Sequence, residues 1–493
     1  MVNDLPGNWV MISLGDIIRK IEAGKNYRCI ERPPVGDETG IVKVSAVSWG
    51  QFRQDESKTI QKEEHRDERY LIRSGDLLMS RANTIELVGA SVIVGEIQRA
   101  LQLSDKVLRL CLVDGFEKWV NLYINSRGGR VQIESLATGA QQSMRNISQD
   151  SIRRITLPFP PLNEQRRIVD KIESLFVQLD HGEASPRGVQ QLLARYRQSV
   201  LKAAVTGQLT ADWRSENADR LESGHDLLER ILQARRENWQ GRGKYKEPVA
   251  SDTSDMPELP EGWAWASFEQ LFDVYGGATP SRKDSKHWNG DIPWVSSGEV
   301  AFCRIKNTEE KITEAGYQSC STKLHPEGTV LLAMIGEGKT RGQAAILDIP
   351  ACNNQNSAAI RVSESGIPCD YVYYYLMGRY QESRRAGQGG NQPALNGSKV
   401  KSFVMPLPSI DEMREIATRV DEAFYTSEAL ATWCETELTR SAALRQSILK
   451  DAFAGKLVPQ DPNDEPANEL LARIRAERDA AVPKKRTRKK VTA

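Results

Sequence analysis

The sequence has few histidines, and its cysteines do not form the closely spaced pairs found in zinc sites. The five histidines (His65, His181, His225, His287 and His325) include no pair at helical or zinc-finger spacing. The seven cysteines are an odd number and are scattered along the chain without a CxxC pair. We therefore expect reduced, mostly buried thiols, and neither a disulfide framework nor a zinc site.

Long apolar runs are also missing. No run approaches the roughly 18 residues that a membrane span needs, and the N-terminal MVNDLPGNWVMISLGD lacks a basic region followed by an apolar core. We expect a cytoplasmic protein. A length of 493 residues with 39% hydrophobic and 27% charged residues is ordinary for a soluble protein with more than one domain. The net charge of +1 neither supports nor excludes nucleic acid, because a binder needs a local basic face rather than a basic total.

Signatures of catalysis are incomplete in this sequence. Neither Pro-Pro pair, at Pro33 and at Pro160, fits the Asn, Asp or Ser followed by Pro-Pro-aromatic that an amino-methyltransferase needs. The segment Gly338–Thr340 resembles the end of a phosphate loop, but Ala333 stands where the loop's first glycine belongs, so a polar turn is favoured over a nucleotide site. A nuclease site at Asp291 with Glu309–Lys311 is a spacing that chance produces in so charged a chain. The sequence predicts no catalysis, and no cofactor or metal held by this chain.

A long segment of the chain occurs twice. The stretch LPFPPLNEQRRIVDKIESLF from Leu157, closing with RQSVLKAAVTGQL at Leu209, returns from Met405 as MPLPSIDEMREIATRVDEAF and closes with RQSILKDAFAGKL. Glu412 lies 248 residues after Glu164, and the same offset aligns residues 139–209 with 387–457 without a gap, with 16 identities in 71 columns. A solenoid would repeat every 20 to 50 residues, whereas this period is half the chain.

The segments before each repeated stretch also match. Each half opens with a Trp-containing motif, LPGNW or LPEGW, followed by a short amphipathic helix candidate and by β-rich runs with glycine turns. We expect strands at Ile41–Val47 and Ile292–Ser296, strands after turn glycines at Gly75–Ser80 and Gly328–Ala333, and apolar helices at Trp119–Ser126 and Tyr371–Gly378. Each half is therefore predicted to be an α+β globular unit of roughly 150 residues followed by a long helix.

The repeated stretches carry a helical seam. Apolar residues recur at spacings of four and three in both copies: Ile168, Ile172, Leu175 and Leu179 in the first, and Ile416, Val420, Ala423 and Phe424 in the second. Such a seam indicates a helix that packs on another helix. We expect Asn163 and Asp411 as N-caps after proline-extended segments. We also expect Ser185–Gly188 (SPRG) to interrupt the first helix, with Ser185 capping a new one.

The twice-found pairing of a PLPPLxEQ-like segment with a helix ending in SxLKxAFxGxL resembles the DNA-specificity subunit of type I restriction-modification systems. The resemblance covers nearly the whole chain and includes IPWVSSGE from Ile292 and GGNQPALNG from Gly389. The first copy carries it on Pro158, Pro160, Glu164, Gln165, Ser199, Leu201, Lys202, Ala204, Gly207 and Leu209, and the second on Pro406, Pro408, Glu412, Ser447, Leu449, Lys450, Ala452, Phe453, Gly455 and Leu457. Met413 departs from the pattern at the position of Gln165.

The resemblance implies an α+β fold with two target-recognition domains and two long antiparallel spacer helices. The implied domains are residues 1–157 and 257–405 for recognition, 158–209 and 406–457 for the spacers, 210–256 for a helix and linker, and 458–493 for a C-terminal helix and basic tail. Each recognition domain would read half of a bipartite asymmetric site on double-stranded DNA. The implied partners are two modification subunits, which bind S-adenosylmethionine and methylate adenine, and two restriction subunits, which use ATP and Mg²⁺.

Polar side chains between strands are the candidates for touching DNA, because Asn, Gln, Ser, Thr, Arg and Lys reach base edges and phosphates. A solvated turn or a cap is the competing interpretation for each. The candidates are Lys43, Ser45, Ser80, Arg81, Asn83 and Thr84 in the first half, and Ser296, Ser297, Lys339, Thr340, Arg341, Gln343, Asn353, Asn354 and Gln355 in the second.

Several further segments have two interpretations each. The glycine-rich residues 139–145 and 387–392 could approach phosphate through backbone amides or form packing turns. Amphipathic helices are expected within 213–247 and over 468–480; they could dock modification subunits or pack on the spacer. The basic run at 484–490 could add salt-sensitive DNA affinity or be a solvated end. The rival to a DNA-recognition subunit is a protein–protein scaffold with two heads on a coiled coil.

Overall fold

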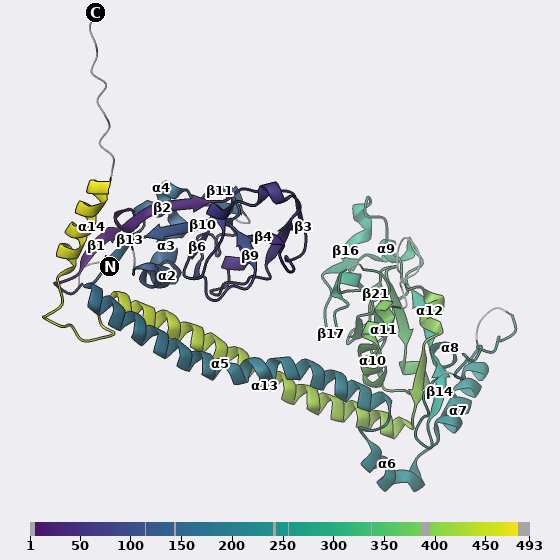
Figure 1. The fold of residues 1–493 in the computed structure, drawn as a ribbon. Coiled ribbons are helices and arrows are strands. Elements are labelled where there is room, and N and C mark those ends of the chain that lie inside the picture. Colours follow the sequence, from purple (N-terminus) through teal and green to yellow (C-terminus); the bar gives the residue numbers. More distant parts are fainter. Residues whose placement is uncertain are drawn as a thin grey trace, which may run out of the picture. The chain divides into compact units, whose positions relative to one another are not determined.

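The computed structural model describes residues 5–113, 115–141, 144–239, 243–254, 256–336, 338–385 and 395–481. The chain divides into two compact units: unit 1 is Met1–Pro186 with Glu435–Ala493, and unit 2 is Arg187–Cys434. Each unit has a mixed α+β head and half of each of two long helices, α5 (Leu162–Val205) and α13 (Ile410–Phe453) (Figure 1). The predicted class, α+β with two heads and two long helices, is confirmed. The division between the units falls inside the helices rather than at the edges of the heads.

The head of unit 1 is built on an antiparallel sheet with strand order β2-β10-β6-β8, beside a second sheet with order β3-β5-β4-β9. Two smaller sheets pair β1 with β13 and join β11, β12 and β7 in that order. The strands are β1 (Val10–Ser13), β2 (Ile18–Ala23), β3 (Cys29–Ile30), β4 (Thr39–Val42), β5 (Ser57–Ile60), β6 (Leu77–Ser80), β7 (Ala82–Asn83), β8 (Ser91–Ile93), β9 (Ala100–Gln102), β10 (Val107–Leu112), β11 (Thr138–Gln141), β12 (Met144–Asn146) and β13 (Thr156–Phe159).

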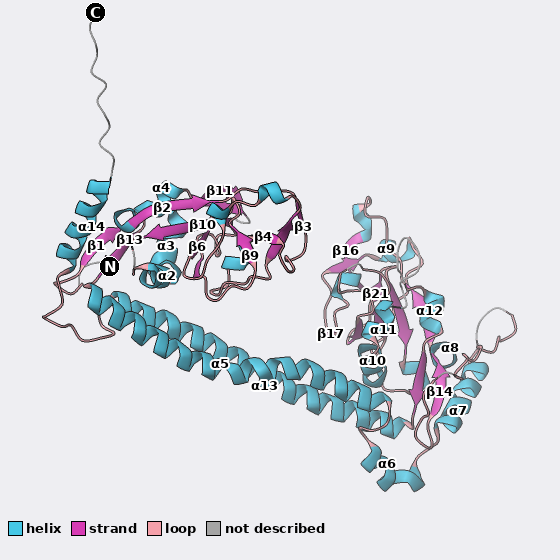
Figure 2. Ribbon diagram, viewed as in Figure 1, coloured by secondary structure: helices cyan, strands magenta, loops and turns pink. Residues whose placement is uncertain are grey.

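Helices cover one face of the first sheet of unit 1. Helix α2 (Glu117–Asn125) lies beside this sheet (Figure 2), and its Trp119 and Val120 pack in one core with Leu77 and Met79 of β6. The indole of Trp119 also donates to the carbonyl of Pro158, at 3.0 Å, in the strand that leads into α5. The other helices of unit 1 are α1 (Leu14–Ile17), α2 (Glu117–Asn125), α3 (Arg127–Leu136), α4 (Gln149–Arg154) and α14 (Ala467–Ala481).

The head of unit 2 has a sheet with strand order β15-β22-β19-β20-β17, a small sheet β18-β16-β21 and the pair β14-β23. The aromatic helix α10 packs on the larger sheet in the core of this unit, and the hydroxyl of Tyr371 donates to the carbonyl of Pro406 at 2.9 Å. The strands are β14 (Ala264–Ser267), β15 (Asp273–Gly276), β16 (Trp288–Val295), β17 (Cys303–Ile305), β18 (Glu310–Ile312), β19 (Val330–Ala333), β20 (Ala344–Leu347), β21 (Cys352–Asn353), β22 (Ser357–Arg361) and β23 (Val404–Leu407). The helices are α6 (Ala211–Asn217), α7 (Gly224–Glu237), α8 (Phe268–Leu271), α9 (Glu314–Gln318), α10 (Cys369–Gly378), α11 (Tyr380–Arg385) and α12 (Gly397–Lys401).

Several strands and helices predicted from the repeat are confirmed. Strands β6 and β19 follow Gly75 and Gly328, which have φ of +89° and +79°, a backbone region that glycine enters without steric cost. Helices α2 and α10 cover most of the two predicted apolar helices. The expected strand at 41–47 is half wrong, because β4 ends at Val42 and a 3-10 turn occupies Val44–Val47.

The short helices expected after each Trp motif are single turns. Helices α1 and α8 have four residues each and lead directly into strands β2 and β15. The apolar residues that suggested an amphipathic helix are buried on the two sides of this change from helix to strand: Leu14 and Ile17 in the turn, and Ile18 and Ile21 in the strand. Over so short a stretch, the alternation of a strand and the period of a helix put apolar residues at similar positions, so the sequence pattern does not distinguish them.

The expected interruption of the first long helix is wrong. Helix α5 runs through Pro186 without a break. Contacts with α13 hold α5 before this proline, where Glu183 accepts from Ser441 at 2.7 Å, and after it, where Arg197 donates to Ser427 at 2.7 Å. An interior proline costs a helix about 3 kcal/mol, and packing on both sides of it offsets that cost.

The expected N-caps are also corrected. Helix α13 begins at Ile410, and its cap is Ser409, whose hydroxyl accepts from the backbone N–H of Glu412 at 3.2 Å. Helix α5 begins at Leu162, so Asn163 lies in its first turn, as Asp411 does in α13. Pro161 precedes α5, and its carbonyl accepts from the N–H of Gln165 at 2.9 Å.

The seam residues are buried to different depths. Ile168 and Ile172 have no exposed surface and belong to the core of unit 1, as Ile416 and Val420 do in unit 2. The remaining seam residues are half-buried: Leu175, Leu179, Ala423 and Phe424. In each unit an arginine of one helix lies over a phenylalanine of the other, Arg445 over Phe176 and Arg197 over Phe424. The repeat therefore makes the same helix–helix contact in both units.

The amphipathic helices outside the repeats pack on their own units. Leu227 and Ile231 of α7 are buried in the core of unit 2, and Leu470, Leu471 and Ile474 of α14 in the core of unit 1. Helix α7 lies against β14 and α8, and α14 against α1, so their apolar faces pack on the heads rather than on the spacer.

All seven cysteines are free thiols, as expected. Cys352 and Cys434 are buried and the other five are half-buried, so the thiols are less deeply buried than predicted. In the described ranges no helix is long and apolar enough to cross a bilayer.

Candidate nucleic-acid interface

In unit 1 the candidate surface lies where β6 ends and the antiparallel β10 begins. Ser80 of β6 and Val107 of β10 are partners in register, so the residues just outside them, Arg81 and Lys106, come together. The backbone N–H of Arg81 donates to the carbonyl of Lys106 at 2.8 Å, and both side chains are exposed. We call this place the β6–β10 end.

The small sheet of β11, β12 and β7 adds further polar groups to the β6–β10 end. The backbone N–H of Ile147 donates to the carbonyl of Arg81 at 3.0 Å, and Arg145 of β12 pairs with Asn83 of β7. The Asn83 amide donates to the hydroxyl of Ser48 at 3.0 Å. Three cations, Arg81, Lys106 and Arg145, thus occupy one end of the head, with Asp105 as the acid next to Lys106 in the sequence. Such a local group of cations suits a polyanion even though the net charge is near zero.

Unit 2 has the same backbone arrangement with other side chains. Ser357 of β22 is the register partner of Ala333 of β19, and the N–H of Met334 donates to the carbonyl of Asn356 at 2.8 Å. The N–H of Leu395 donates to the carbonyl of Met334 at 3.0 Å, as Ile147 does to Arg81 in unit 1. We call this place the β19–β22 end. Here Met334 is 7% exposed, and the neighbouring polar side chains are Gln355 and Asn356.

The predicted residues of unit 1 have unequal exposure. Ser80 has no exposed surface, and its hydroxyl donates to the carbonyl of Leu87 at 2.7 Å, so it holds a turn. Ser45 donates to Glu56 at 2.7 Å, and Lys43 pairs with Glu31 at 3.8 Å. The hydroxyl of Thr84 is bound by the Glu86 carboxyl, whose pKa is lowered first by its own backbone N–H and then by this hydroxyl. Arg81 and, through its free face, Asn83 remain the candidates for DNA.

In unit 2 the buried candidates have structural partners. Asn353 has no exposed surface and donates to the carbonyl of Ser357 at 2.8 Å. Asn354 is 7% exposed and accepts from the N–H of Asn356 at 3.1 Å. Arg341 is 6% exposed and donates to the carbonyl of Arg384 at 3.1 Å. These three side chains shape the loops, so the structure gives them a structural role.

The remaining candidates of unit 2 are at least partly exposed. Lys339 and Gln355 are exposed, and Thr340, Gln343, Ser296 and Ser297 are half-buried. The backbone N–H of Ser296 donates to the carboxylate of Glu299 at 2.7 Å, where a 3-10 turn begins. The side-chain oxygen of Gln355 accepts from Thr279, which leaves its amide nitrogen outward as a donor. DNA contact by these residues stays a prediction.

Sequence reasoning missed Lys106 and Asn356 and treated Arg145 only as part of a glycine-rich turn. Each reaches the site through strand pairing with a segment far away in the chain, Lys106 with Arg81 and Arg145 with Asn83. The repeat does not pair Lys106 with Asn356, and their one shared feature in the chain is that Lys106 directly precedes β10 and Asn356 directly precedes β22. The predicted loop 387–392 and the basic run 484–490 lie outside the described residues.

A buried histidine, His325, contacts strand β22 of the β19–β22 end through Arg361. His325 has no exposed surface, and burial and then the Arg361 charge lower its pKa to about 4. It is therefore neutral at pH 7, with its Nδ1 accepting from Nε of Arg361 at 3.3 Å. Its backbone pairs with Ala351, next to β21, so its place is structural.

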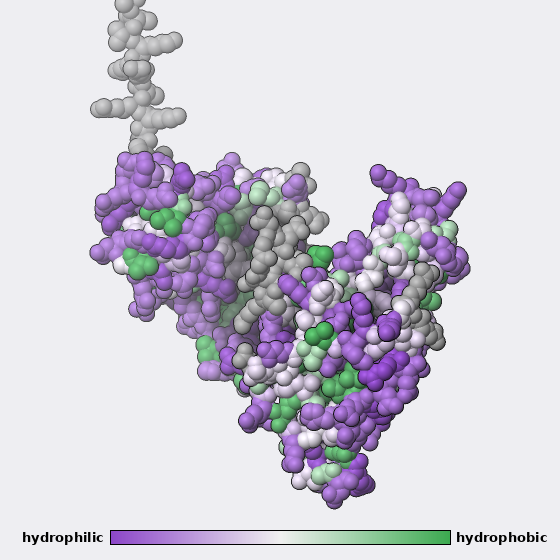
Figure 3. All heavy atoms as spheres, turned by 90° about the vertical axis from the view of Figure 1, so that its right-hand side faces the viewer, coloured by the Kyte–Doolittle hydropathy of each residue, from purple (hydrophilic) through white to green (hydrophobic). Residues whose placement is uncertain are grey.

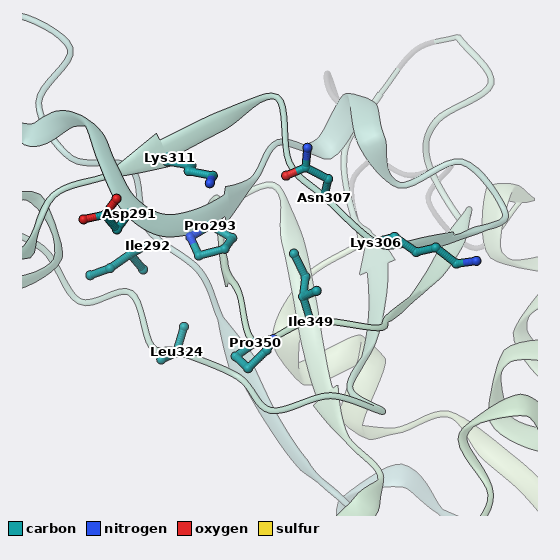
Figure 4. Close-up of a pocket in the computed structure, with 9 residues that line it drawn as sticks. All are labelled: Asp291, Ile292, Pro293, Lys306, Asn307, Lys311, Leu324, Ile349 and Pro350. Carbon is teal, nitrogen blue, oxygen red and sulfur yellow. The ribbon is translucent and has the colours of Figure 1, made fainter.

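Asp291 and Lys311, from the nuclease spacing weighed above, line a cleft of unit 2. This open cleft of about 520 Å³ is lined by the polar residues Asp291, Lys306, Asn307 and Lys311 and by the apolar residues Ile292, Pro293, Leu324, Ile349 and Pro350, with Asp291 and Lys306 on opposite sides (Figure 4). Glu310, from the weighed nuclease spacing, pairs with Arg282 instead. Within the described parts of the chain, no three His, Cys, Asp or Glu side chains are grouped to hold a metal. On the face shown in Figure 3, the residues drawn in colour are largely hydrophilic, and the hydrophobic ones form small separate groups.

Comparison with known proteins shows which family this chain resembles. A family model described as the type I restriction modification DNA specificity domain matches residues 260–432. The chain is 30% identical over 180 residues to the type I restriction enzyme MjaIX specificity subunit of Methanocaldococcus jannaschii, covering 36% of this chain and 41% of that one. It is 25% identical over 385 residues to the EcoDI specificity subunit of Escherichia coli, covering 75% of this chain and 79% of that one.

A solved structure shares the fold. A chain from work on complex assembly and conformational transition of the type I restriction-modification system has a TM-score of 0.59 at 20% identity, covering 92% of this chain and 99% of that chain. The matched relatives are specificity subunits, and the family model covers most of the head of unit 2 and the start of α13. Residues 260–432 thus match the type I restriction modification DNA specificity domain, and over most of its length the chain is similar to DNA-specificity subunits of type I restriction-modification systems.

Proposed function

We propose that this chain gives a type I restriction-modification complex its DNA sequence specificity, and that each unit reads one part of a bipartite site on double-stranded DNA. The observation that carries the proposal is the pair of equivalent strand ends, which share backbone hydrogen bonds and carry different exposed polar side chains. DNA bases are distinguished by the donor and acceptor pattern in the major groove. Two strand ends that have the same backbone arrangement but different side chains would suit a DNA site whose two halves differ in sequence.

The long helices support the proposal that half-site spacing is set by this chain. Helices α5 and α13 have 44 residues each, and each continues from one unit into the other. The half-sites must present compatible faces of the duplex to their readers, so their separation follows the helical repeat of DNA. Helix length would then determine the spacer length of the site.

The partners of the chain are part of the proposal. Two modification subunits would bind S-adenosylmethionine and methylate a flipped adenine, and two restriction subunits would use ATP and Mg²⁺. This chain would contribute recognition and positioning, and no catalytic step. Because α7 and α14 bury their apolar faces on their own units, docking of modification subunits there would use the polar faces of these helices.

The protein–protein scaffold is the second candidate and is not favoured. Protein interfaces are anchored by aromatic and apolar side chains in buried pockets. The β6–β10 end instead presents Arg81 and Lys106, and the β19–β22 end presents Gln355 and Asn356. These are the residue types that contact bases and phosphates.

A map of N6-methyladenine in the host tests the proposed function. Wild type and a strain lacking this chain are compared by single-molecule sequencing, and we expect one bipartite motif to lose its methylation in the second strain. Replacement of residues 1–157 by those of a relative should then alter one half of the motif. An unchanged map, in a host whose modification subunit is shown to be active, would favour the scaffold.

A further inference from the structure

We propose that the two strand ends read different bases: Arg81 and Lys106 at the β6–β10 end contact guanine, and Gln355 and Asn356 at the β19–β22 end contact adenine. The inference rests on the proposed function and deepens it, because it assigns a base class to each unit. It concerns residues that the repeat alone does not single out, since Lys106 and Asn356 are equivalent only through strand pairing.

The equivalence of the two places is defined by the backbone. In unit 1, the N–H of Arg81 donates to Lys106 at 2.8 Å and the carbonyl of Arg81 accepts from Ile147 at 3.0 Å. In unit 2, the N–H of Met334 donates to Asn356 at 2.8 Å and the carbonyl of Met334 accepts from Leu395 at 3.0 Å. Ile147 and Leu395 are both buried. Each bridge therefore fixes two chain segments to a rigid sheet, which is the support that a base-reading side chain needs.

The anchoring continues behind the two bridges. The N–H of Gly24 donates to the carbonyl of Ser104 at 3.1 Å, just before Lys106, and the N–H of Ala278 donates to the carbonyl of Asn353 at 3.0 Å, just before Gln355. A Cβ on Gly24 or on Gly277 would overlap the backbone of Leu103 or Asn353. The two loops are therefore held by close backbone packing in both units, and their differences lie in the side chains.

The side chains differ in the hydrogen bonds that they can make. Arg81 and Lys106 carry donors, and Arg or Lys pairs best with the O6 and N7 acceptors of guanine. Asn356 and Gln355 carry amides, which pair with the N6 donor and N7 acceptor of adenine. Gln355 is exposed while its oxygen accepts from Thr279, so its amide nitrogen can face adenine N7. Asn356 is half-buried, and its backbone N–H donates to the Asn354 side chain; its own side-chain amide carries both a donor and an acceptor.

The contrast between the units favours base contact over phosphate contact. Phosphates are the same at both half-sites, so a position that served a phosphate would keep a cation in both units. Unit 2 instead has the buried Met334 in place of Arg81, and the neutral Asn356 in place of Lys106. A change of chemistry at an unchanged backbone position is expected where two different base pairs are read.

The test is the methylation map of hosts that carry single variants in place of the wild-type chain. Arg81→Ala and Lys106→Ala should each relax the motif at a guanine of one half-site by about tenfold or more, leaving the other half-site intact. Asn356→Ala should relax an adenine of the other half-site. Lys106→Asn, which copies unit 2, should shift preference at its position from guanine towards adenine.

Matched controls lie elsewhere on the same heads. Arg73 is exposed and precedes β6 at its other end, and Asn307 is an exposed amide of unit 2 beside the cleft in Figure 4. Arg73→Ala and Asn307→Ala should leave the motif unchanged. The untouched half-site in each variant also reports that the complex is folded and active.

Two outcomes would overturn the inference. If Arg81→Ala and Lys106→Ala lower methylation equally at all sequences, with a shallower dependence of binding on salt, the side chains contact phosphate. If the motif and its strength are unchanged, these ends do not touch the site. Failure of the proposed function would look different, because the wild-type chain itself would then support no sequence-specific methylation.

Discussion

The two units hold an equivalent buried glutamate with different partners. In unit 2, Glu412 is 1% exposed and accepts from the Trp263 indole at 2.9 Å, the Thr210 hydroxyl at 2.8 Å and the Arg214 guanidinium at 2.7 Å. In unit 1, Glu164 has no exposed surface and accepts from the Trp9 indole at 3.0 Å and from the Gln460 amide. One carboxyl is thus paired with a cation, and the other is bound by neutral donors.

The difference shows two ways of burying the same acid. An ionised carboxylate in a protein interior needs a partner of opposite charge, or its pKa rises until it is neutral. In unit 2 the arginine supplies the charge. In unit 1 burial raises the pKa of the Glu164 carboxyl. The hydrogen bonds from Trp9 and Gln460, and then the charge of Arg167, which is itself paired with Asp464, oppose that rise only in part. The repeat therefore keeps the position of the acid and of the tryptophan, while the charge of the group that binds the acid differs between the units.

Removing the charge from Glu412 should give the largest effect. Glu412→Gln leaves the Arg214 guanidinium, 20% exposed, without its counter-ion, and an arginine cannot become an acceptor. We expect unit 2 to lose roughly 3–5 kcal/mol of unfolding free energy. Amide hydrogen exchange read by mass spectrometry, peptide by peptide, measures the loss in unit 2 separately from unit 1.

The matched variant in unit 1 is Glu164→Gln. The Gln460 amide can turn over so that its oxygen accepts from the new side chain, so we expect a loss of about 1 kcal/mol. A loss as large as that of Glu412→Gln would mean that Glu164 is ionised and paired, and would contradict the comparison.

The proline of α5 is the second difference between the units. Pro186 aligns with Cys434 of α13 by the offset of 248 residues, and both are buried. Pro186→Ala restores the hydrogen bond to the Gly182 carbonyl and should slow exchange around residues 182–190, with a gain of up to about 3 kcal/mol. Cys434→Pro should cost α13 a similar amount. Unchanged hydrogen exchange after Pro186→Ala would show that Pro186 does not destabilise α5.

The glycines that end the long helices should behave alike. Gly207 and Gly455 both have φ of +70°, and a Cβ there would overlap the ring of Pro260 or of Pro6. Gly207→Ala should destabilise unit 2, and Gly455→Ala unit 1, each by at least about 1–2 kcal/mol. Gly188→Ala, in α5 with open space around its Cβ position, is the control and should be neutral or slightly stabilising. Effects that differ strongly between the two helix ends would break the equivalence of the units.

The smallest effect is a pH dependence confined to unit 1. The pKa of Glu164 is raised above its ordinary value of 4.5 by burial, so its protonated form favours the folded state. That contribution is fully present below the ordinary pKa and is lost as pH rises through the raised pKa. The difference in stability between wild type and Glu164→Gln, followed by hydrogen exchange corrected for intrinsic rates, should therefore shift in favour of the glutamine variant as pH rises. A constant difference across that range would contradict the assignment.

Much of the fold could be predicted because local pattern and the repeat agree. The turn glycines before the apolar runs of β6 and β19, and the spacing of Ile168 and Ile172, specify strand and helix without reference to distant residues. Prediction from the sequence pattern failed where neighbouring elements are short, as at α1 and α8, because one turn of helix and a short strand have similar spacings of apolar residues. It also failed at Pro186, because packing on both sides of the proline outweighs its local cost.

The sequence by itself determined that the chain contains two equivalent halves, which residues form the helical seam of each, and that a long helix follows each head, because these features depend on periodicity and on a constant offset. Tertiary structure decided which polar side chains face outward. Ser80, Arg341, Asn353 and Asn354 are buried with backbone partners, whereas Arg81 and Lys106 meet at a strand end. A polar residue in a loop can bind its own chain or a ligand, and strand register, set by contacts far apart in the sequence, chooses between them.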